Sequence, residues 1–457
     1  MATNPLKEES TMDKVSKIFK KSDKKTSNDE NNGIIRCEFV GSNRAIDIIA
    51  EACACCWDKK VPDTYEERCE YVAKRTRTGH TSILEHSNFS IYFRVTGIFV
   101  EDMINFLTWN EYCHVEMRNM GHNDWRFLMS GSLRGFSFIY TKANDLNNAV
   151  LKALSSVLYL YAPSAAFEDI CKQNLMNLDN FVKIDNFDDY MQNNNLTTHY
   201  KEDVNEHFEI VGLDGIQILY TNLMNIDPDF ARMLKTKDLL DHVTVTVLFK
   251  NMSRIITQQQ TRHRNGITQE SQRYVNYTNI GFNSPALFKD KIDPNHKYNI
   301  RFGPSSNLSM TLQEIGDAIV SIYGMLYNPV VAGKYALVPE DARAFLPNNA
   351  QSRKLYMTFT YSHLFKYFLL REHGGAQAEI RMYAKEIAEW VRNNTAFCSK
   401  EITDLYTMPK LLIEDPFTID VDEGVVEEVM ELTEDDYIKA SGLDKELDEE
   451  SKSEVNK

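Results

Sequence analysis

The chain has 457 residues, and its 51 Lys and Arg against 66 Asp and Glu give a formal net charge of -15. Apolar residues make up 43% of the chain, which is enough for a sizeable core and excludes global disorder. The acidic balance argues against a nucleic-acid coat protein, since such proteins need surplus basic charge to neutralise phosphates. No apolar stretch approaches the roughly 20 residues that cross a bilayer, and the eight cysteines are ordinary usage. We therefore expect a soluble protein of a reducing, cytoplasmic compartment.

The acidic charge is concentrated near the C-terminal end of the sequence. Residues 421–457 contain fourteen Asp and Glu against four Lys, so this segment carries about -10 and the rest about -5. With few large apolar residues it is predicted to be a disordered, solvated tail, and partner docking is the alternative. Residues 1–33, rich in Lys, Ser, Asn and Asp, are predicted to be a second disordered end, with no secretory signal. The folded domain is then expected at residues 34–420.

Predicted helices and strands alternate between these two ends. Helical spacing or capping signals predict helices at residues 44–57, 65–73, 146–161, 252–264, 308–326, 362–372 and 375–393. Alternation of apolar and polar residues predicts strands at residues 89–95 and 242–249. The fold class expected from this order is α+β. The polar stretch at about 171–237 has no regular period and is predicted to be an insertion or elaborated loop, within an insertion spanning about 140–240.

Two of the predicted helices have specific boundary signals. Thr64 is followed three residues later by Glu67, which is the spacing of a capping box, and Gly79 can end the same helix. Asn43 can cap the helix at residues 44–57. These signals fix where two elements begin before any tertiary contact is considered.

Several common site motifs are absent from the sequence. It contains no Gly-rich Walker or Rossmann loop, so any nucleotide must be held by side chains or by other backbone geometry. It contains no HExxH and no paired CxxC, so no metal site is expected. No GxSxG elbow occurs.

One segment, SRIITQQQTRHRNGITQESQRY at residues 253–274, concentrates Arg, Gln and Ser. On a helix Gln259 and Arg262 share a face, while Arg264 lies about 200° round from Arg262. Arg262 and Arg264 could therefore bind two different anions from one helix end.

The Asn-Gly pair after this RHR triplet ends the helix, and Ser271 and Arg273 fall on one side if the next segment is extended. Converging Arg, Gln and Ser donors form a credible cradle for a phosphate and a pyrimidine. The alternative is a surface helix whose arginines pair with the surplus acids. Three consecutive glutamines, which a solvated face does not need, favour the site.

The run QQQTRHRNGITQESQRY at residues 258–274 resembles the signature of flavin-dependent thymidylate synthases, an RHR followed by seven residues and Ser. Other segments resemble the same family in the same order. They are GHTSILEH at 79–86, the Val-Thr strand before Ser253, DARAFLPN at 341–348, FLLR at 368–371 and AQAEIR at 376–381. Together the resemblance covers, with gaps, about residues 35–415.

This resemblance implies a mixed sheet with long flanking helices, assembled as a homotetramer whose active sites are shared between chains. It implies reductive methylation of deoxyuridylate (dUMP) to thymidylate (dTMP). FAD would be the cofactor, with NADPH and methylenetetrahydrofolate as co-substrates, and no membrane or nucleic-acid polymer as partner.

The resemblance also assigns roles to individual residues. It implies FAD contacts from His80, Arg262, His263, Arg264, Gln269, Thr360 and Lys366. It implies dUMP contacts from Gln259, Arg262, Gln269, Glu270, Ser271, Gln272, Arg273, Arg343 and Arg371. His80 would also lie beside the folate. Arg371 would be catalytic, facing the uracil and favouring its ionised form.

The chemistry gives these assignments a physical reason. Methylation at carbon five of uracil needs electron density there, and a nearby cation stabilises the enolate-like form. A reduced flavin supplies hydride, so no cysteine nucleophile is needed and the cysteines are predicted to be packing residues. Ser271 has no adjacent histidine base in the sequence, so its hydroxyl is predicted to bind the nucleotide rather than to attack it.

The chain departs from the family pattern at two places. Only six residues separate Arg264 from Ser271 where the family has seven, and Thr360 and Lys366 stand where family members often have asparagine. The shorter loop motivates an alternative reaction, such as hydroxymethylation of a pyrimidine, and a catalytically silent nucleotide-binding paralogue is a further alternative. Read alone, Glu85 and His86 could also form no more than a local surface pair.

Overall fold

The computed structural model describes residues 33–42, 45–97, 100–101, 104, 113–136, 189, 192–195, 201–213, 215–263, 266–278, 280–283, 293–302, 304 and 306–394. All of them lie in the first of two compact units, residues 1–398. The predicted tail at 421–457, the predicted helix at 146–161, Asn43 and Arg264 lie outside the described residues.

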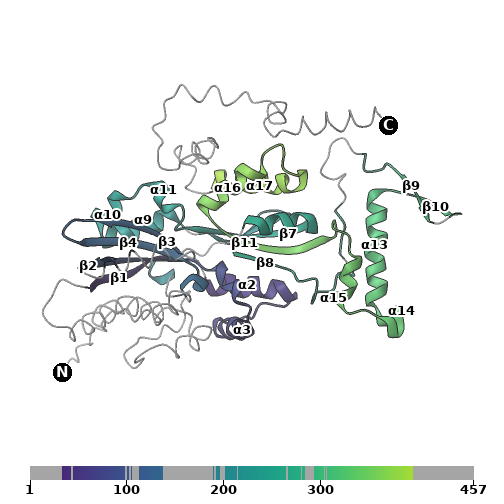
Figure 1. Ribbon diagram of the computed structural model, residues 1–457, viewed down its shortest axis with the longest axis horizontal. Coiled ribbons are helices and arrows are strands. Elements are labelled where there is room, and N and C mark those ends of the chain that lie inside the picture. Colours follow the sequence, from purple (N-terminus) through teal and green to yellow (C-terminus); the bar gives the residue numbers. More distant parts are fainter. Residues whose placement is uncertain are drawn as a thin grey trace, which may run out of the picture. The chain divides into compact units, whose positions relative to one another are not determined.

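The strands form two larger sheets and one ribbon (Figure 1). A four-stranded sheet has the order β1 (Gly33–Ser42), β2 (Phe89–Thr96), β4 (Asp124–Gly131), β3 (Cys113–Asn119). A five-stranded sheet has the order β5 (Glu202–Asp203), β6 (Phe208–Leu213), β7 (Thr244–Ser253), β11 (Gln351–Thr360), β8 (Gly266–Gln269). The ribbon is β9 (Tyr298–Phe302) with β10 (Ser306–Met310).

Every strand pair among the described residues is antiparallel. The α+β class is therefore confirmed, but the mixed sheet that the resemblance implied is wrong for this part of the chain. The reason is local: β7 and β11 each run straight into a helix, and β11 pairs antiparallel with both β7 and β8.

The longer helices are α2 (Ala45–Trp57), α3 (Tyr65–Arg77), α9 (Ile216–Ile226), α13 (Leu312–Tyr327), α16 (Tyr361–Arg371) and α17 (Ala378–Asn394). Short ones are η2 (Thr81–His86), α10 (Pro228–Met233), α11 (Thr236–Leu239), α12 (Arg254–Gln260), η4 (Thr261–His263), α14 (Pro329–Ala332), η6 (Gly333–Tyr335), α15 (Pro339–Ala342) and η7 (Arg343–Phe345). None of the described helices alone is long and apolar enough to span a bilayer. Only α13 taken together with the segment Pro329–Tyr335, across a 70° bend, passes that test of length and composition.

The predicted capping box and glycine turn of α3 are confirmed, although the helix runs to Arg77 rather than to residue 73. Thr64 and Glu67 form both halves of the capping box. Gly79 adopts a φ of 91°, and the backbone N–H of His80 donates to the carbonyl of Arg75 at 3.1 Å. This is the left-handed glycine termination of a helix, and η2 begins two residues later, at Thr81.

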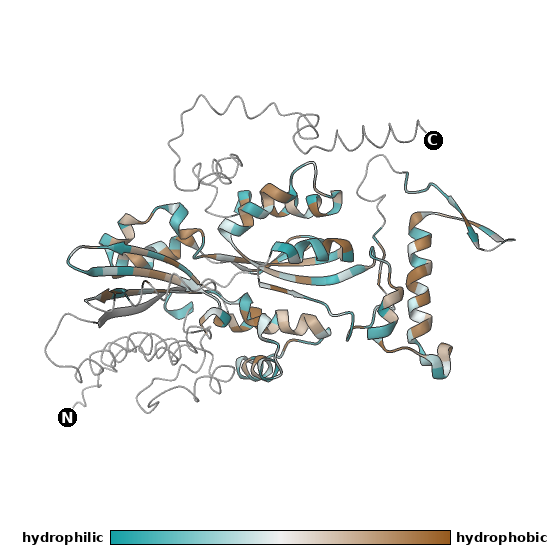
Figure 2. Cartoon of the chain, viewed as in Figure 1, coloured by the Kyte–Doolittle hydropathy of each residue, from teal (hydrophilic) through white to brown (hydrophobic). Residues whose placement is uncertain are grey.

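Helices cover both faces of the five-stranded sheet, with α2 and α3 on one side and α16 and α17 on the other (Figure 1). On the first side Ile48, Ala52 and Cys55 of α2 pack against buried side chains of β6, β7 and β11. Figure 2 shows apolar residues along both the central strands and the helix faces. Burial of this apolar surface, worth about 25 cal/mol per Å², is what joins helix to sheet.

The expected irregular loop at 171–237 does not hold for its C-terminal part. Residues 208–213 form β6, which pairs with β7, and residues 216–233 form α9 and α10. Leu219, Leu223 and Phe230 of these helices are buried. Polar composition masked the helical spacing of these few apolar residues, and the pairing of β6 with β7 depends on contacts distant in sequence.

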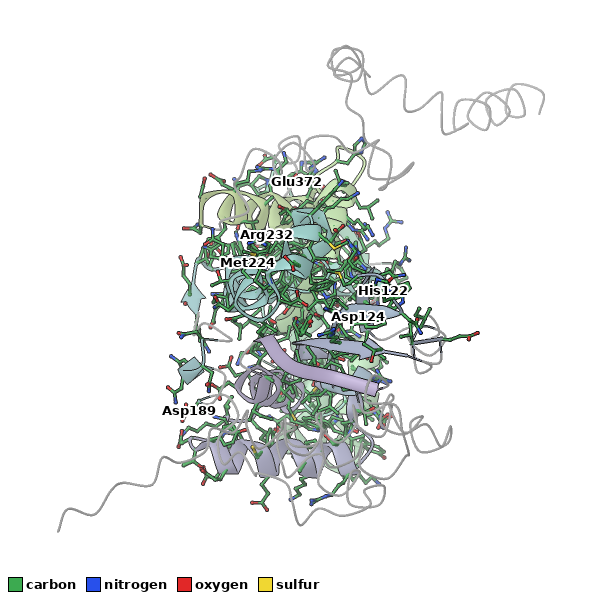
Figure 3. The ribbon with its side chains drawn as sticks, turned by 90° about the vertical axis from the view of Figure 1, so that its left-hand side faces the viewer. His122, Asp124, Asp189, Met224, Arg232 and Glu372 are labelled. Carbon is green, nitrogen blue, oxygen red and sulfur yellow. The ribbon has the colours of Figure 1, made fainter. Side chains whose placement is uncertain are left out.

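The four-stranded sheet is joined to α10 by a charged network. Asp124 of β4, labelled beside His122 in Figure 3, pairs with Arg94 at 2.5 Å and with Arg126. Arg126 also donates to Asp227 at 2.6 Å, and Asp227 caps α10 by accepting from the N–H of Phe230. Hydrogen-bonded networks of this kind fix orientation more than they add stability.

A buried histidine joins η2 to the five-stranded sheet. His86 is fully buried, with Nδ1 2.9 Å from Thr358 Oγ1 on β11 and Nε2 2.8 Å from Thr268 Oγ1 on β8. Burial lowers its pKa to about 3, so the imidazole is neutral. Glu85 pairs with Arg134 instead. The reading of Glu85 and His86 as a local surface pair is therefore wrong.

Candidate active site

The signature segment begins at the junction of β7 and α12. Ser253 ends the strand, and its Oγ accepts from the N–H of Ile256 and so caps the helix. Glu379 of α17 is buried and accepts from both the N–H and the Oγ of Ser253, at 2.7 and 2.6 Å. The predicted helix at 252–264 thus starts two residues later, at Arg254, and ends in a 3-10 turn at His263. The buried carboxylate fixes the direction in which α12 leaves the sheet.

The end of α16 lies against the end of the signature helix. Arg371 donates from Nε to Nε2 of His263 at 2.9 Å and from Nη2 to the carbonyl of Gln259 at 3.4 Å. The ring of Tyr367 lies edge-on to His263, with centroids 5.0 Å apart. Burial, with smaller effects of Arg371 and His363, lowers the pKa of His263 to about 4. The imidazole is therefore a neutral acceptor for the arginine.

A second group joins Arg254, which the sequence did not assign to the site, to predicted site residues. Its Nη1 donates to Oε1 of Gln269 on β8 at 2.9 Å. Burial lowers its pKa, Tyr277 opposes that effect, and the charge of nearby Arg343 adds to it. Within the described residues this guanidinium has no carboxylate partner, so it is a half-buried cation available to an anion. Its position directly after the capping Ser253 was the available signal.

The residues after β8 form a turn rather than the extended segment considered from the sequence. The N–H groups of Tyr274 and Val275 both donate to the carbonyl of Ser271, at 3.1 and 3.0 Å. The N–H of Ser271 donates to the carbonyl of Cys56 at the end of α2. Ser271 and Gln272 are half-buried in this turn, whereas Arg273 is exposed. The turn therefore presents Arg273 to solvent beside α15.

Glu270 faces the protein interior. Its side chain is buried, accepts from the hydroxyl of Tyr277 and the N–H of Arg353 at 3.1 Å each, and pairs with Arg353 Nε at 3.0 Å. Burial raises its pKa against the opposing effect of Arg353. The side chain of Glu270 thus holds the turn to β11, and its contact with nucleotide stays a prediction.

An aromatic group contacts His80 at the same, C-terminal end of α2. The ring of Trp57 lies edge-on to His80 with centroids 4.9 Å apart, stacks on Tyr274 at 6.2 Å, and has Arg75 over its face at 4.3 Å. Sequence reasoning missed Trp57, which no motif marks. The group brings the GHTSILEH segment next to the signature turn, as a shared site requires.

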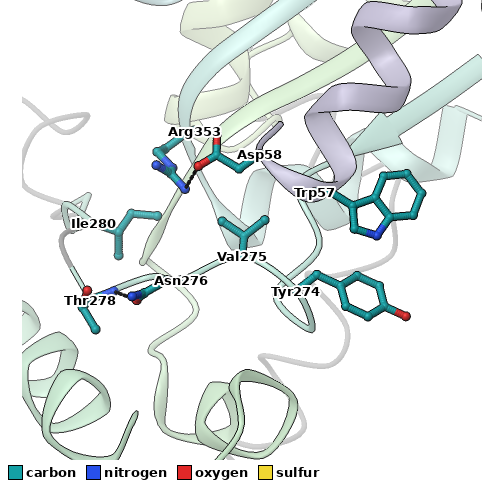
Figure 4. Close-up of a pocket in the computed structure, with 8 residues that line it drawn as sticks. All are labelled: Trp57, Asp58, Tyr274, Val275, Asn276, Thr278, Ile280 and Arg353. Carbon is teal, nitrogen blue, oxygen red and sulfur yellow. Dashed lines mark hydrogen bonds and ion pairs between the residues drawn. The ribbon is translucent and has the colours of Figure 1, made fainter. Parts of the chain in front are cut away.

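A pocket of about 350 Å³ opens beside this group (Figure 4). It is lined by Trp57, Asp58, Tyr274, Val275, Asn276, Thr278, Ile280 and Arg353. The pair of Asp58 with Arg353, 3.1 Å apart, forms one wall. The pocket therefore combines flat aromatic side chains with two charged side chains that neutralise each other.

Two predicted FAD residues lie on α16. Thr360 is at its start, eleven residues from Arg371 at the other end. Thr360 caps the helix by accepting from the N–H of His363, and its hydroxyl donates to Asp241 at 3.3 Å. Lys366 is exposed in the middle of the helix, six residues after Thr360. Since a helix rises 1.5 Å per residue, the two ends of α16 are about 16 Å apart. They could contact different parts of one extended ligand.

The region that matches known proteins contains the signature segment and α16. Residues 226–395 match the family model described as thymidylate synthase complementing protein. The chain is 31% identical over 165 residues to a flavin-dependent thymidylate synthase of Geobacter sulfurreducens, a match that covers 36% of this chain and 63% of that protein. The GHTSILEH segment precedes the matched range, yet His86 contacts two strands within it. The resemblance seen in the sequence is thereby confirmed: residues 226–395 match this family model, and the chain is similar to a flavin-dependent thymidylate synthase.

Proposed function

We propose that the protein converts dUMP to dTMP, with methylenetetrahydrofolate as one-carbon donor and FAD, reduced by NADPH, as the flavin cofactor. The chain spans 63% of its relative's length, and the relative's name supports a flavin-dependent thymidylate synthase. The observation that carries the proposal is the convergence of Arg371 on His263 and Gln259. Arg371 is 108 residues from His263 and 112 residues from Gln259 in the chain, so this contact joins two separate motifs.

Arg371 is the residue we assign to the uracil. It is half-buried beside an imidazole that is neutral, so His263 adds no positive charge of its own next to the guanidinium. A fixed cation in a partly dry site stabilises the enolate-like form of the pyrimidine more than a solvated one does. Gln259, which donates to Gln377 at 2.7 Å, can turn its amide toward the same ring.

The phosphate of dUMP is assigned to the arginines on the other side of the signature. Arg254 and Arg343 lie close together, and Arg273 projects from the turn at 271–274. Guanidinium groups suit a phosphate because they present several N–H donors in a planar fork. Gln269 accepts from Arg254, and Ser271 and Gln272 stand in the turn just before Arg273, so these neutral side chains could complete the contacts.

The residues assigned to FAD fit the chemistry of that group. Arg262 and Lys366 are exposed cations suited to a pyrophosphate, and His80 stands in an aromatic group suited to a flat ring. Thr360 and Asp241 together offer a hydroxyl and a carboxylate to a sugar or ribityl hydroxyl. When bound, the reduced flavin would supply hydride to the one-carbon unit. The role of Arg264 remains part of the proposal.

We further propose a homotetramer in the cytoplasm, in which several chains build each site. The support is apolar surface on α14 and the segments around it. Val330, Val331 and Tyr335 are 90%, 61% and 73% exposed, and Phe345 of η7, two residues from Arg343, is 49% exposed. Clustered apolar side chains of this size favour burial against another protein surface.

Tritium release from dUMP labelled at carbon five tests the proposed reaction, with FAD, folate and NADPH added or omitted in turn. We expect release that needs all three and that falls in Arg371→Ala and Arg262→Ala but not in Arg232→Ala, an exposed control on α10. The product mass must equal that of dTMP, since a hydroxymethyl product would replace this proposal with the alternative reaction. Absence of release from folded protein that binds no flavin would refute it.

A further inference from the structure

An ion pair between Arg273 and Glu340 lies at the proposed phosphate site. Arg273 Nε lies 2.7 Å from Oε1 of Glu340, and Arg273 Nη2 lies 3.1 Å from Oε2. Both N–H groups of one guanidinium edge therefore meet both oxygens of one carboxylate. This is the two-pronged arrangement in which an arginine also binds a phosphate.

The same glutamate contacts a second arginine of the site through its backbone. Nε of Arg343 donates to the carbonyl oxygen of Glu340 at 3.0 Å. Arg343 in turn lies close enough to Arg254 for its charge to lower the pKa of Arg254, after the larger effect of burial. Glu340 thus stands between Arg273 and the Arg254–Arg343 group.

The charge balance of this group is positive. Arg254, Arg273 and Arg343 bring three positive charges, and among the described contacts Glu340 supplies the single carboxylate hydrogen-bonded to them. One carboxylate leaves an excess that a dianion would neutralise better. A phosphate monoester carries about -1.5 to -2 at neutral pH and offers three acceptor oxygens.

We propose that in the free protein the carboxylate of Glu340 binds the guanidinium of Arg273 at the position that the nucleotide phosphate takes. When the nucleotide binds, its phosphate replaces this carboxylate. This inference rests on the proposed function, because it takes the phosphate of dUMP as the ligand of Arg273. The exchange is feasible because Arg273 and Glu340 are 47% and 46% exposed, and exposed pairs contribute little stability. Glu340 would act as a competitor that only a phosphate-bearing ligand displaces.

The exchange makes Glu340 a determinant of ligand choice. A nucleoside without phosphate cannot replace the carboxylate on Arg273, so it binds without breaking the pair and gains nothing from the three cations. A nucleotide breaks the pair and gains contacts with all three. Removing the negative charge of Glu340 should therefore strengthen nucleotide binding and leave nucleoside binding unchanged.

Equilibrium binding of dUMP and of deoxyuridine to the full chain tests this inference. We expect Glu340→Gln to bind dUMP about two- to fivefold more tightly than wild type, the range expected for loss of an exposed competing pair. Deoxyuridine should bind equally to both proteins. Asp341→Asn, which removes the same charge from the same short helix at an exposed position, controls for long-range electrostatics and should change dUMP binding less.

The outcomes separate this inference from the proposed function. If wild type binds dUMP but Glu340→Gln binds it equally or more weakly, Glu340 instead holds Arg273 in place and the exchange is wrong. Equal gains in Asp341→Asn would also overturn it. If wild-type protein with a normal melting profile binds no dUMP, the proposed function itself fails. Glu340→Ala repeats the measurement should the amide retain the contact with Arg273.

Discussion

Nε of Arg371 donates a hydrogen bond of 2.9 Å to Nε2 of His263, although the two residues are 108 positions apart in the chain. The bond needs an imidazole whose Nε2 carries no proton. Burial keeps the ring neutral by lowering the pKa of His263 to about 4, and the bond from Arg371 then requires the tautomer with its proton on Nδ1. The guanidinium is therefore held at the end of the RHR segment by a neutral partner. Its charge remains available to a ligand.

Replacing Arg371 should reduce turnover more than it reduces stability. We expect Arg371→Ala to lower the rate of dTMP formation by about 100- to 1000-fold, the usual cost of losing one electrostatic stabiliser of a transition state. Arg371→Lys should restore little, because an ammonium lacks the fork that reaches both His263 and Gln259. Arg232→Ala is the control. A variant with Arg371→Ala that turns over normally would place the uracil elsewhere.

Arg254 should affect nucleotide binding rather than the chemical step. Because it is half-buried with a neutral hydrogen-bond partner in Gln269, a bound phosphate would gain a charge-assisted bond worth about 1.5–3 kcal/mol. We expect Arg254→Gln to raise the KM for dUMP about 10- to 100-fold with a smaller change in kcat. Steady-state kinetics at varied dUMP measure the split. A lowered melting temperature with unchanged KM would show that Arg254 is a structural residue only.

Local signals in the sequence predicted the parts of the fold that depend on local chemistry. The capping box of Thr64 and Glu67 and the turn at Gly79 fix α3 through contacts within a few residues, so the sequence contained all the information. The same is true of α16, whose predicted bounds differ from the observed ones by one residue at each end. The convergence of Arg371 with Gln259 came from the family resemblance, since no local rule joins residues 112 positions apart.

What the sequence could not predict depends on pairing across the sheet. Glu270 stands inside the motif that the resemblance assigns to ligand binding. It directly follows β8, its N–H donates to the carbonyl of Lys354 on β11, and its carboxylate pairs with Arg353. Arg254 and Trp57 joined the site through partners on other elements, Gln269 and His80. Register and packing decide such contacts, and neither can be read from a single segment.

His86 should make the stability of the protein sensitive to acid. Its folded pKa of about 3 lies below the ordinary value of 6.5, so the unfolded chain binds the extra proton first as the pH falls. The stability that this neutral, buried side chain contributes is therefore fully present above about pH 6.5 and is lost on descent towards pH 3. His242, also fully buried with a pKa of about 3, acts in the same direction.

The measurement is the free energy of unfolding from denaturant titrations between pH 7 and pH 4. His86→Gln should lose about 2–4 kcal/mol at pH 7, since Thr268 loses a hydrogen-bond partner and Thr358 retains only Thr246. It should also show a shallower pH slope, reduced by up to about 1.4 kcal/mol per pH unit. His296→Gln, at an exposed position, should retain the wild-type slope. An unchanged slope in His86→Gln would mean that His86 is protonated without unfolding.

Two glycines of α13 provide a matched test of packing next to the site. A Cβ at Gly316 would lie 2.1 Å from the ring of Phe282, whereas one at Gly324 would meet Thr278 Cγ2 at an ordinary 3.6 Å. Both positions are helical, so alanine should gain about 0.5–1 kcal/mol at either one from backbone entropy alone. Gly324→Ala should therefore raise the melting temperature slightly. Gly316→Ala should lower it, because overpacking costs about 1–3 kcal/mol.

The loss in Gly316→Ala should extend to activity, because Phe282 adjoins Asn283. Asn283 donates to the buried carboxylate of Glu379 at 3.0 Å, and Glu379 holds Ser253 at the start of α12. A displaced Phe282 would shift this support and, through it, the helix that carries Gln259 and Arg262. We expect a lower kcat in Gly316→Ala even at temperatures where the variant is fully folded, with Gly324→Ala as active as wild type. If Gly316→Ala melts and turns over like Gly324→Ala, Phe282 relaxes without cost and the contact does not support the site.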